Sequence, residues 1–382
     1  MLTVIIIFII ALLLVVYALF KSKGIDVWWL NYIKGRISVF RLARPPRIHI
    51  LFCFVDHYEP RWRTTDIEDE RRRVDNWVSK YPIMAGRHQD ADGCHPKHTF
   101  FYPEEEYRKE HLDKIQGICK QGYGEVEIHL HHHDDNETDF RRKISEFRDL
   151  LVSNHGLLSK DPEGKPGFAF IHGNWALDNS DPKGINCGIN NEITILREEG
   201  CYLDMTMPSS PHPTQTSKVN SIYMAIDDTE KPKSHDTGKD VEFNRKMQGD
   251  LLMVQGPLCF NWHNKKLGII PKIENGDIRK TIPPGEKRID MWVRQHIHIK
   301  GNPEWVFIKI HTHGAQDQDM DTLLGSDMDE MFSYLENKYN DGEKYVLHYV
   351  TAREVYNIIR AASDGKKGNP NRYRDYYYSE YS

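Results

Sequence analysis

Apolar runs of strand length alternate with helical patterns along most of the chain, beginning near Arg47. Residues 48–55 form an apolar run that predicts a buried strand, and residues 66–80 show helical periodicity after the capping pair Thr65 and Glu68. Further predicted strands lie at residues 98–101, 125–131, 167–171, 202–205, 306–310 and 345–350. About seven such strand–helix units indicate an α/β protein with a parallel sheet or barrel.

Two segments depart from this alternation. Residues 208–303 are rich in Pro, Gly, Asn and Asp, so we expect a β-containing insertion over the mouth of the barrel. Residues 363–382 are polar and include five tyrosines, and this low apolar content predicts a disordered tail. The main body is therefore expected to span residues 47–362.

The N-terminal residues carry a long apolar run. Residues 2–20 contain no charged side chain, and this is about the length that crosses roughly 30 Å of hydrocarbon. A cleaved signal peptide is the alternative, but no basic residue precedes the run, and Phe20 followed by Lys21 is a poor cleavage site. Residues 1–20 are therefore predicted to be a single-pass transmembrane helix.

The linker at residues 21–46 suggests an orientation for the body. Seven basic residues lie between positions 21 and 47 against a single acid, Asp26, so the positive-inside rule predicts a body that faces the cytoplasm. An extracytoplasmic body is the alternative. Trp28, Trp29 and Tyr32 suit an interfacial aromatic belt, so we expect the linker to lie along lipid headgroups.

The amino-acid composition favours some classes of function over others. The net charge of −5 over 382 residues excludes the strongly basic footprint that is typical of nucleic-acid binding. The 20 histidines, many in short clusters, point instead to metal chemistry. The six cysteines show no C-x-x-C pairing, which argues against a structural zinc site or a dense disulfide framework.

Polar side chains gather where the predicted strands end. They are Asp56 and His57 after the first strand, His131, His133 and Asp135 at the third, His172 and Asn174 after the fourth, Asp204 on the fifth, and His311 and His313 after the sixth. In a barrel the carboxyl ends of all strands meet on one face. We therefore expect these residues, which are distant in sequence, to converge on one site.

The segment at residues 127–135 has the clearest metal-binding pattern. If the strand continues, period-two alternation places Glu127, His129, His131 and His133 on one face. Imidazole and carboxylate are ligands of zinc and similar divalent ions, and catalytic sites use three protein ligands with a water. A solvated polar loop is the alternative.

Three other strand ends allow both a chemical and a structural interpretation. A carboxylate beside a histidine, as at Asp56 and His57, suits a base next to a metal ligand, although a simple turn would also place them there. His311 or His313 could donate a proton to a leaving group, or could merely cap the strand. The turn at residues 172–175 ends in Trp175, whose face could stack on a sugar ring or simply pack.

These landmarks, in this order, resemble the polysaccharide deacetylases of carbohydrate esterase family 4. The resemblance covers roughly residues 47–362 outside the insertion. It implies a distorted (β/α)7 barrel that uses a divalent metal, expected to be Zn²⁺, to remove acyl groups, in particular acetyl groups, from a carbohydrate. The substrate would be a cell-surface polysaccharide or its lipid-linked precursor.

The resemblance also suggests a role for each landmark. Asp56 matches the family's catalytic base, and His57 stands where the family has a metal-binding aspartate. His131 matches a metal-binding histidine, and the family's second histidine position falls on Asp135. The metal ligands would then be His57 and His131 with either Asp135 or His133.

The remaining motifs are matched more loosely. Residues 308–313 match the family's final strand, which makes His313 or His311 the acid that protonates the leaving group. Residues 172–174 stand at the family's third motif. The residues expected to bind substrate are His172, Asn174, Trp175 and Asp204.

Two other functions are compatible with the same residues. A glycoside hydrolase of the same barrel class would need two carboxylates across the sugar, such as Asp56 and Asp204, roughly 5 to 9.5 Å apart. A non-catalytic polysaccharide-assembly factor with a decayed metal site is the other alternative. The density of histidines argues against the glycoside hydrolase.

Overall fold

The computed structural model describes residues 1, 14, 17–18, 20–43 and 45–380. Its strands are β1 (Ile48–His57), β2 (His98–Pro103), β3 (Gly124–Leu130), β4 (Ser159–Lys160), β5 (Pro166–His172), β6 (Cys201–Asp204), β7 (Ile222–Ala225), β8 (Lys239–Asp240), β9 (Leu251–Val254), β10 (Cys259–Lys266), β11 (Ile270–Glu274), β12 (Asp277–Ile278), β13 (His298–Ile299), β14 (Asn302–Thr312) and β15 (Tyr345–Val350).

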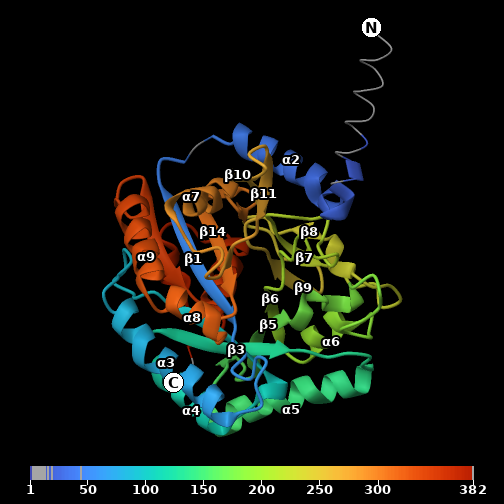
Figure 1. Cartoon of the computed structure of the whole chain (residues 1–382), viewed down its shortest axis with the longest axis vertical. Coiled ribbons are helices and arrows are strands. Elements are labelled where there is room, and N and C mark those ends of the chain that lie inside the picture. Colours follow the sequence, from blue (N-terminus) through green and yellow to red (C-terminus); the bar gives the residue numbers. More distant parts are fainter. Residues whose placement is uncertain (2–13, 15–16, 19, 44, 381–382) are drawn as a thin grey trace.

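Within the described part of the chain, 13 of these strands form one large, mostly parallel sheet (Figure 1). Hydrogen-bonded neighbours follow the order β12-β14-β1-β2-β3-β5-β6-β9-β7-β8, while β13 pairs with β14, β15 with β1 and β4 with β5. The α/β class is therefore confirmed. The closed (β/α)7 barrel is not shown, since no pairing joins the end strands β12 and β8 in the part of the chain that is described.

Helices pack on both sides of β1. The helices are α2 (Ile25–Arg41), α3 (Ile67–Ala85), α4 (Lys109–Cys119), α5 (Glu137–His155), α6 (Glu192–Glu198), α7 (Glu286–Gln295), α8 (Asp317–Leu323), α9 (Ser326–Tyr339) and α10 (Ala352–Ser363), with short 3-10 helices η1 (Glu104–Glu106), η2 (Gly173–Trp175), η3 (Leu177–Asn179), η4 (Ser234–Asp236) and η5 (Pro370–Tyr373). Phe52 and Phe54 belong to the cluster that includes α3 and α9, whereas Leu51 and Val55 belong to the cluster that includes α10. This alternation is the period-two pattern of a strand that is buried on both faces.

Local sequence signals set the helix ends. At α10 the side chain of Thr351 accepts the backbone N–H of Glu354 and the Glu354 side chain accepts the backbone N–H of Thr351, which confirms the expected capping box. At α3 the cap is Asp66, whose side chain accepts the N–H of Glu68. The expected capping residue was Thr65, paired with Glu68, so the observed cap lies one residue later in the chain.

The segment expected to be an insertion is part of the main sheet. Residues 208–303 contribute β7, β8 and β9 to one end of it and β12 to the other. The two strands β10 and β11 form a separate antiparallel pair. The segment is thus β-containing, as predicted, but most of its strands extend the sheet.

The prediction of a transmembrane anchor is overturned. No helix among the described residues has both the length and the apolar character that a membrane crossing requires. This finding contradicts the predicted single-pass membrane location. The predicted cytoplasmic orientation of the body, and its extracytoplasmic alternative, depended on that anchor and are withdrawn with it. Most of the predicted span, residues 2–13, 15–16 and 19, lies outside the described residues.

The linker forms the helix α2 instead of an interfacial belt. Trp28 is fully buried and stacks on Phe260 of β10, with ring centroids 5.1 Å apart. Tyr32 meets the same ring edge-on at 5.5 Å. Two of the three aromatic residues expected at headgroups therefore attach α2 to the body, and Figure 1 shows this helix beside β10 and β11.

The C-terminal tail packs against the body, which corrects the expected disorder. The Tyr378 ring lies 4.5 Å from that of Tyr202 and 5.4 Å from that of Tyr356. Arg374 is buried and donates to the carbonyl of Tyr349 at 2.6 Å and to Glu354 at 3.0 Å. Aromatic rings supply the buried area that the low aliphatic content of this segment seemed to lack.

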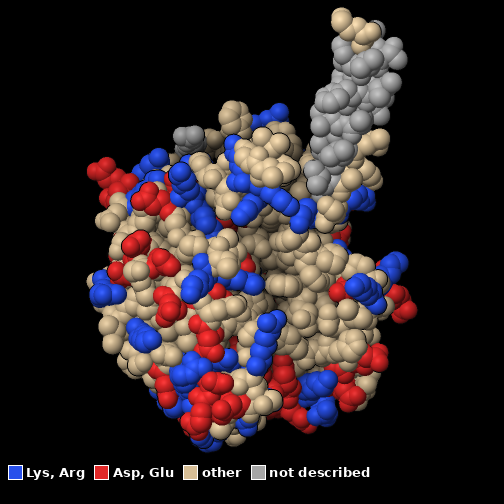
Figure 2. All heavy atoms as spheres, viewed as in Figure 1, with Lys and Arg blue, Asp and Glu red and all other residues tan. Residues whose placement is uncertain are grey.

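Charged side chains of both signs are interspersed over the face shown in Figure 2, and a mainly uncharged area lies near its centre. No large patch of one sign dominates this face.

Candidate metal centre

Parallel strands bring three histidines, His57, His129 and His313, together at their carboxyl ends. Val55 of β1 is in register with His311 of β14, so His57 and His313 lie just beyond the same level. The rings of His57 and His313 stack with centroids 4.7 Å apart, and His57 meets His129 of β3 at 4.9 Å. The expected convergence of strand ends thus places these residues in one cluster.

Glu59 lies at the centre of this cluster. Its Oε1 is 3.3 Å from Nε2 of His129 and 3.3 Å from Nε2 of His131. It also groups with His57 and His313, so that one possible ligand atom of each residue lies within 4.8 Å of the others. The Glu59 side chain is only 3% exposed, so a single buried carboxylate is shared by two sets of potential metal ligands.

Hydrogen bonds orient two of the imidazoles toward Glu59. Nδ1 of His129 lies 2.7 Å from the carbonyl of Ile171, which places a proton on Nδ1 and directs Nε2 at Glu59. Nδ1 of His131 lies 2.5 Å from Glu105. A ligating histidine usually donates its other N–H to a carbonyl or carboxylate, and both residues have this arrangement.

The carboxylates Glu59 and Glu105 favour a positive charge within this cluster. Burial alone would raise the pKa of Glu59, but hydrogen bonds from His129 and His131 hold it well below its usual range. Burial opposes charge on His131, yet Glu105 and Glu59 raise its pKa to about 10. Burial and the neighbouring imidazoles, His313 foremost, lower the pKa of His57 well below its ordinary value, so this ring is neutral.

Several buried polar atoms of the cluster have no partner among the described residues. They are Oε2 of Glu59 and Nδ1 of His311 and of His313. Buried polar atoms without partners are costly, and such atoms commonly mark the place of a ligand or an ion. A divalent ion with nitrogen and oxygen ligands fits the residues that are present.

Access to the cluster is greatest at His131, whose side chain is 29% exposed. Gly173 makes the position of this ring possible, because a Cβ at Gly173 would lie 2.3 Å from His131 Cδ2. The next residues of the same turn are the exposed Asn174 and the half-buried Trp175. The Trp175 ring is 6.4 Å from His313, so the turn expected to contact substrate borders the cluster.

Asp56 contacts different partners from its neighbour His57. Its Oδ2 lies 2.8 Å from Nε2 of His98, and its Oδ1 accepts the backbone N–H of Gly314 at 2.6 Å. A Cβ at Gly314 would come within 2.0 Å of Asp56 Oδ2, so only glycine permits this contact. The geometry therefore makes Asp56 a positioning residue for the turn that carries His313.

Four predicted site residues do not join the cluster. His133 is exposed and accepts the N–H of Asn186 at 3.0 Å, and Asp135 pairs with Lys143 at 2.7 Å. Both follow the end of β3 at Leu130, where the alternation that was expected to align His133 stops. His172 lies in a separate buried group, and Asp204 accepts both the N–H and the hydroxyl of Thr206.

Sequence reasoning missed Glu59 and Glu105 and did not select His129. The signal for Glu59 was its place two residues after His57, beyond a strand end. His129 was visible in the strand alternation. Compared with models of known protein families and with curated proteins, the chain matches none.

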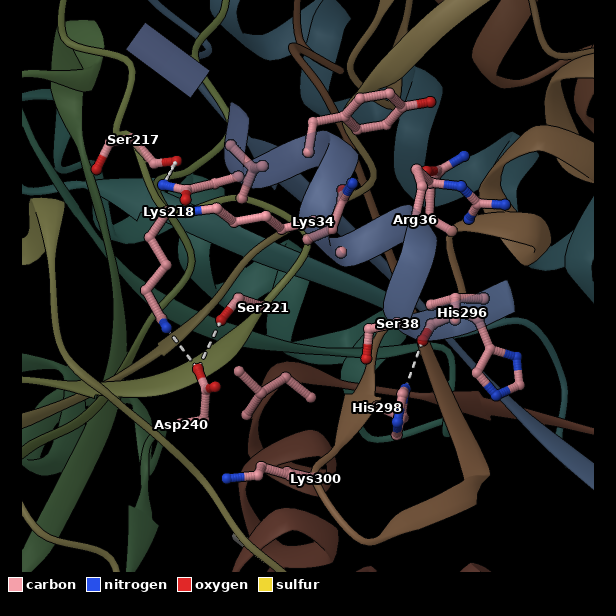
Figure 3. Close-up of a pocket in the computed structure, with 18 of the residues that line it drawn as sticks. Lys34, Arg36, Ser38, Ser217, Lys218, Ser221, Asp240, His296, His298 and Lys300 are labelled. Carbon is pink, nitrogen blue, oxygen red and sulfur yellow. Dashed lines mark hydrogen bonds and ion pairs between the residues drawn. The ribbon is translucent and has the colours of Figure 1, made fainter. Parts of the chain in front are cut away.

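A separate cavity of about 560 Å³ lies between α2 and the strands β7 and β8 (Figure 3). Its lining includes Lys218, which pairs with Asp240 at 2.5 Å, and Lys300, which pairs with Glu242 at 2.5 Å. None of its lining residues belongs to the histidine cluster.

Proposed function

We propose that this protein is a metal-dependent hydrolase that removes an acyl group, in particular acetyl, from a carbohydrate. The observation that carries the proposal is the buried carboxylate of Glu59, held 3.3 Å from the Nε2 atoms of His129 and His131. We also propose that the sheet is an open, divergent form of the deacetylase barrel, because the cluster lies at the carboxyl ends of its parallel strands.

The ligands in this proposal are Glu59, His129 and His131, with Zn²⁺ as the ion. This is a set of two histidines and one carboxylate, which is a common set in catalytic zinc sites. A bound zinc ion lowers the pKa of water toward neutrality and polarises a substrate carbonyl. Glu105 orients His131, and the carbonyl of Ile171 orients His129.

The other cluster residues would move the protons. His57 and His313 are buried, and burial lowers the pKa of both, so each ring is neutral and can accept a proton from attacking water. His313, once charged, can give that proton to the departing amine or alcohol. Asp56 holds Gly314 and so fixes the position of His313.

Substrate would approach from the side of Trp175. Its half-buried ring borders His313, and aromatic faces of this kind stack on sugar rings. The glycoside hydrolase alternative loses support from the same geometry, because its two candidate carboxylates are engaged elsewhere. Asp56 is held by His98 and Asp204 by Thr206.

Metal analysis and acetate release test the proposal together. Purified wild-type protein should contain zinc and should release acetate from an acetylated glycan. His131→Ala should lose the metal of this cluster and the activity while the circular dichroism spectrum is retained. His133→Ala is the matched control, since this exposed neighbour lies outside the cluster, and it should behave like wild type.

Acetate release that survives His131→Ala would contradict the proposed site. A metal-loaded wild-type protein that releases no acetate from any acetylated glycan or ester tested would contradict the proposed reaction.

A further inference from the structure

A second group of potential ligands lies buried beside the first. It consists of His132, His172, Cys187 and Glu192, all of them buried. One ligand atom of each residue lies within 4.8 Å of the others. The four residues come from four different places in the chain: the turn after β3, the end of β5, a loop, and the first turn of α6.

The two imidazoles point their Nε2 atoms at each other. These atoms are 2.8 Å apart. Nδ1 of His172 is hydrogen bonded to the carbonyl of Gly173, so its Nε2 carries a lone pair. Nδ1 of His132 faces Asp135 at 3.4 Å, which is the carboxylate–histidine arrangement usual behind a metal ligand.

Glu192 completes the arrangement on the oxygen side. Its Oε1 lies 3.3 Å from Nε2 of His132 and 3.4 Å from Nε2 of His172. In a tetrahedral site with metal–nitrogen and metal–oxygen bonds of about 2.0–2.1 Å, neighbouring ligand atoms lie about 3.3–3.4 Å apart. The two imidazole nitrogens would separate by only about 0.5 Å to reach this spacing.

The thiol of Cys187 supplies the fourth donor. Its Sγ is 3.4 Å from Oε2 of Glu192 and accepts the backbone N–H of Asn179 at 3.3 Å. An amide donor of this kind stabilises a thiolate, which is the form that binds metal. The second carboxylate oxygen of Glu192 is fixed by the N–H of Asp178 at 2.6 Å.

We propose that His132, His172, Cys187 and Glu192 form a second metal site, of the closed tetrahedral class that binds zinc for structural purposes. All four positions of the ion would be filled by protein, with no place for water, as in structural sites. Binding would release the thiol proton of Cys187. The site is independent of the proposed hydrolase activity, because its ligands are different residues.

The remaining group with suitable residues, Asp90, Asp92 and His348, needs no ion. The guanidinium of Arg374 lies 3.2 Å from Asp90 and 3.3 Å from Asp92 and already supplies the positive charge. Among the residues that the structure describes, no Lys or Arg pairs with Glu192, whose neighbours in the second group are the two imidazoles and the thiol.

Cobalt substitution of the full chain separates the two sites. The first cluster contains no cysteine, so a thiolate-to-cobalt charge-transfer band in the near ultraviolet reports only the second. Protein loaded with Co²⁺ should bind two ions per chain and show this band. Cys187→Ala should lose the band and one ion, whereas Cys94→Ala, which removes a thiol elsewhere, should keep both.

His131→Ala should lose the other ion and retain the band. The wild-type measurement does not depend on the folding of any variant, and a cobalt-loaded wild type without the band overturns the proposal. So does a folded Cys187→Ala protein that keeps the band and both ions.

Discussion

Replacing Glu59 with glutamine tests the metal centre most directly. The variant keeps the size of the side chain and one oxygen, but it removes the charge that His129 and His131 share. Removing one partner of a buried charge interaction costs about 3–5 kcal/mol. At about 1.4 kcal/mol per tenfold change, metal affinity should fall by roughly two to three and a half orders of magnitude.

Glu105→Gln provides a graded comparison. This carboxylate does not face the ion but holds Nδ1 of His131 at 2.5 Å. Loss of such an orienting group typically costs about 10–100-fold in metal affinity, so the effect should be smaller than that of Glu59→Gln. Glu110→Gln is the control for charge alone, because Glu110 pairs with Arg71 at the surface.

Competition with a chromophoric chelator at neutral pH measures the three affinities. The expected order of affinity loss is Glu59 above Glu105, with no change at Glu110. A Glu59→Gln protein that binds zinc as tightly as wild type would refute the assignment of Glu59 as a ligand. A larger loss at Glu105 than at Glu59 would exchange their roles.

Three further outcomes follow from other contacts. Asp56→Asn should retain its metal but lose about 1–3 kcal/mol of unfolding free energy, because the new amide would turn an N–H toward His98 or the N–H of Gly314, which are both donors. Urea denaturation measures the stability and metal analysis measures the occupancy. Metal loss without destabilisation would contradict this prediction. Arg374→Ala should cost about 1.5–3 kcal/mol, because it removes charged hydrogen bonds to Glu354 and to the carbonyl of Tyr349 while Lys97 still pairs with Glu354. The exposed Arg372→Ala should cost little, and equal effects of the two substitutions in denaturation would refute the role of the packed tail. Although burial opposes it, the charges of Lys97 and Arg374 lower the pKa of Glu354 to about 2 from its ordinary value of 4.5. The ionised Glu354 should therefore stabilise the fold by about 3 kcal/mol above pH 4.5, and this contribution should be lost as the pH falls toward 2. Unfolding measured at a series of pH values checks this, and a Glu354→Gln protein should lack that part of the pH dependence.

The sequence pattern predicted the class of fold because strand burial is a local property. A largely apolar run such as residues 48–55, in which His49 is the one polar residue, is unfavourable to expose, and alternation with helices implies parallel strands. The capping box at Thr351 was predictable for the same reason, since both partners lie within one turn. Closure of the sheet was not predictable, because it depends on whether the two edge strands, β12 and β8, pair with each other, and no local pattern specifies that pairing.

The candidate site was predictable only to about one residue beyond each strand end, as for His131 and His313. His129 lies within β3, where alternation fixes its direction, but β3 ends at Leu130. Beyond that point the turn geometry decides, and it directs His132 inward and His133 outward. The Tyr-rich tail was misjudged because its packing against Tyr202 and Tyr356 is a long-range contact that composition does not reveal.

The consecutive residues His131 and His132 face two different groups of ligands. A single peptide bond therefore connects a ligand of the first proposed ion to a ligand of the second. An ion held by His132 would order the backbone from which His131 extends, so capture of the second ion would lose less conformational entropy. By thermodynamic linkage each ion would then strengthen the binding of the other by the same factor. Metal loading would be cooperative, and a variant that has lost one ion would bind the remaining ion more weakly without losing it.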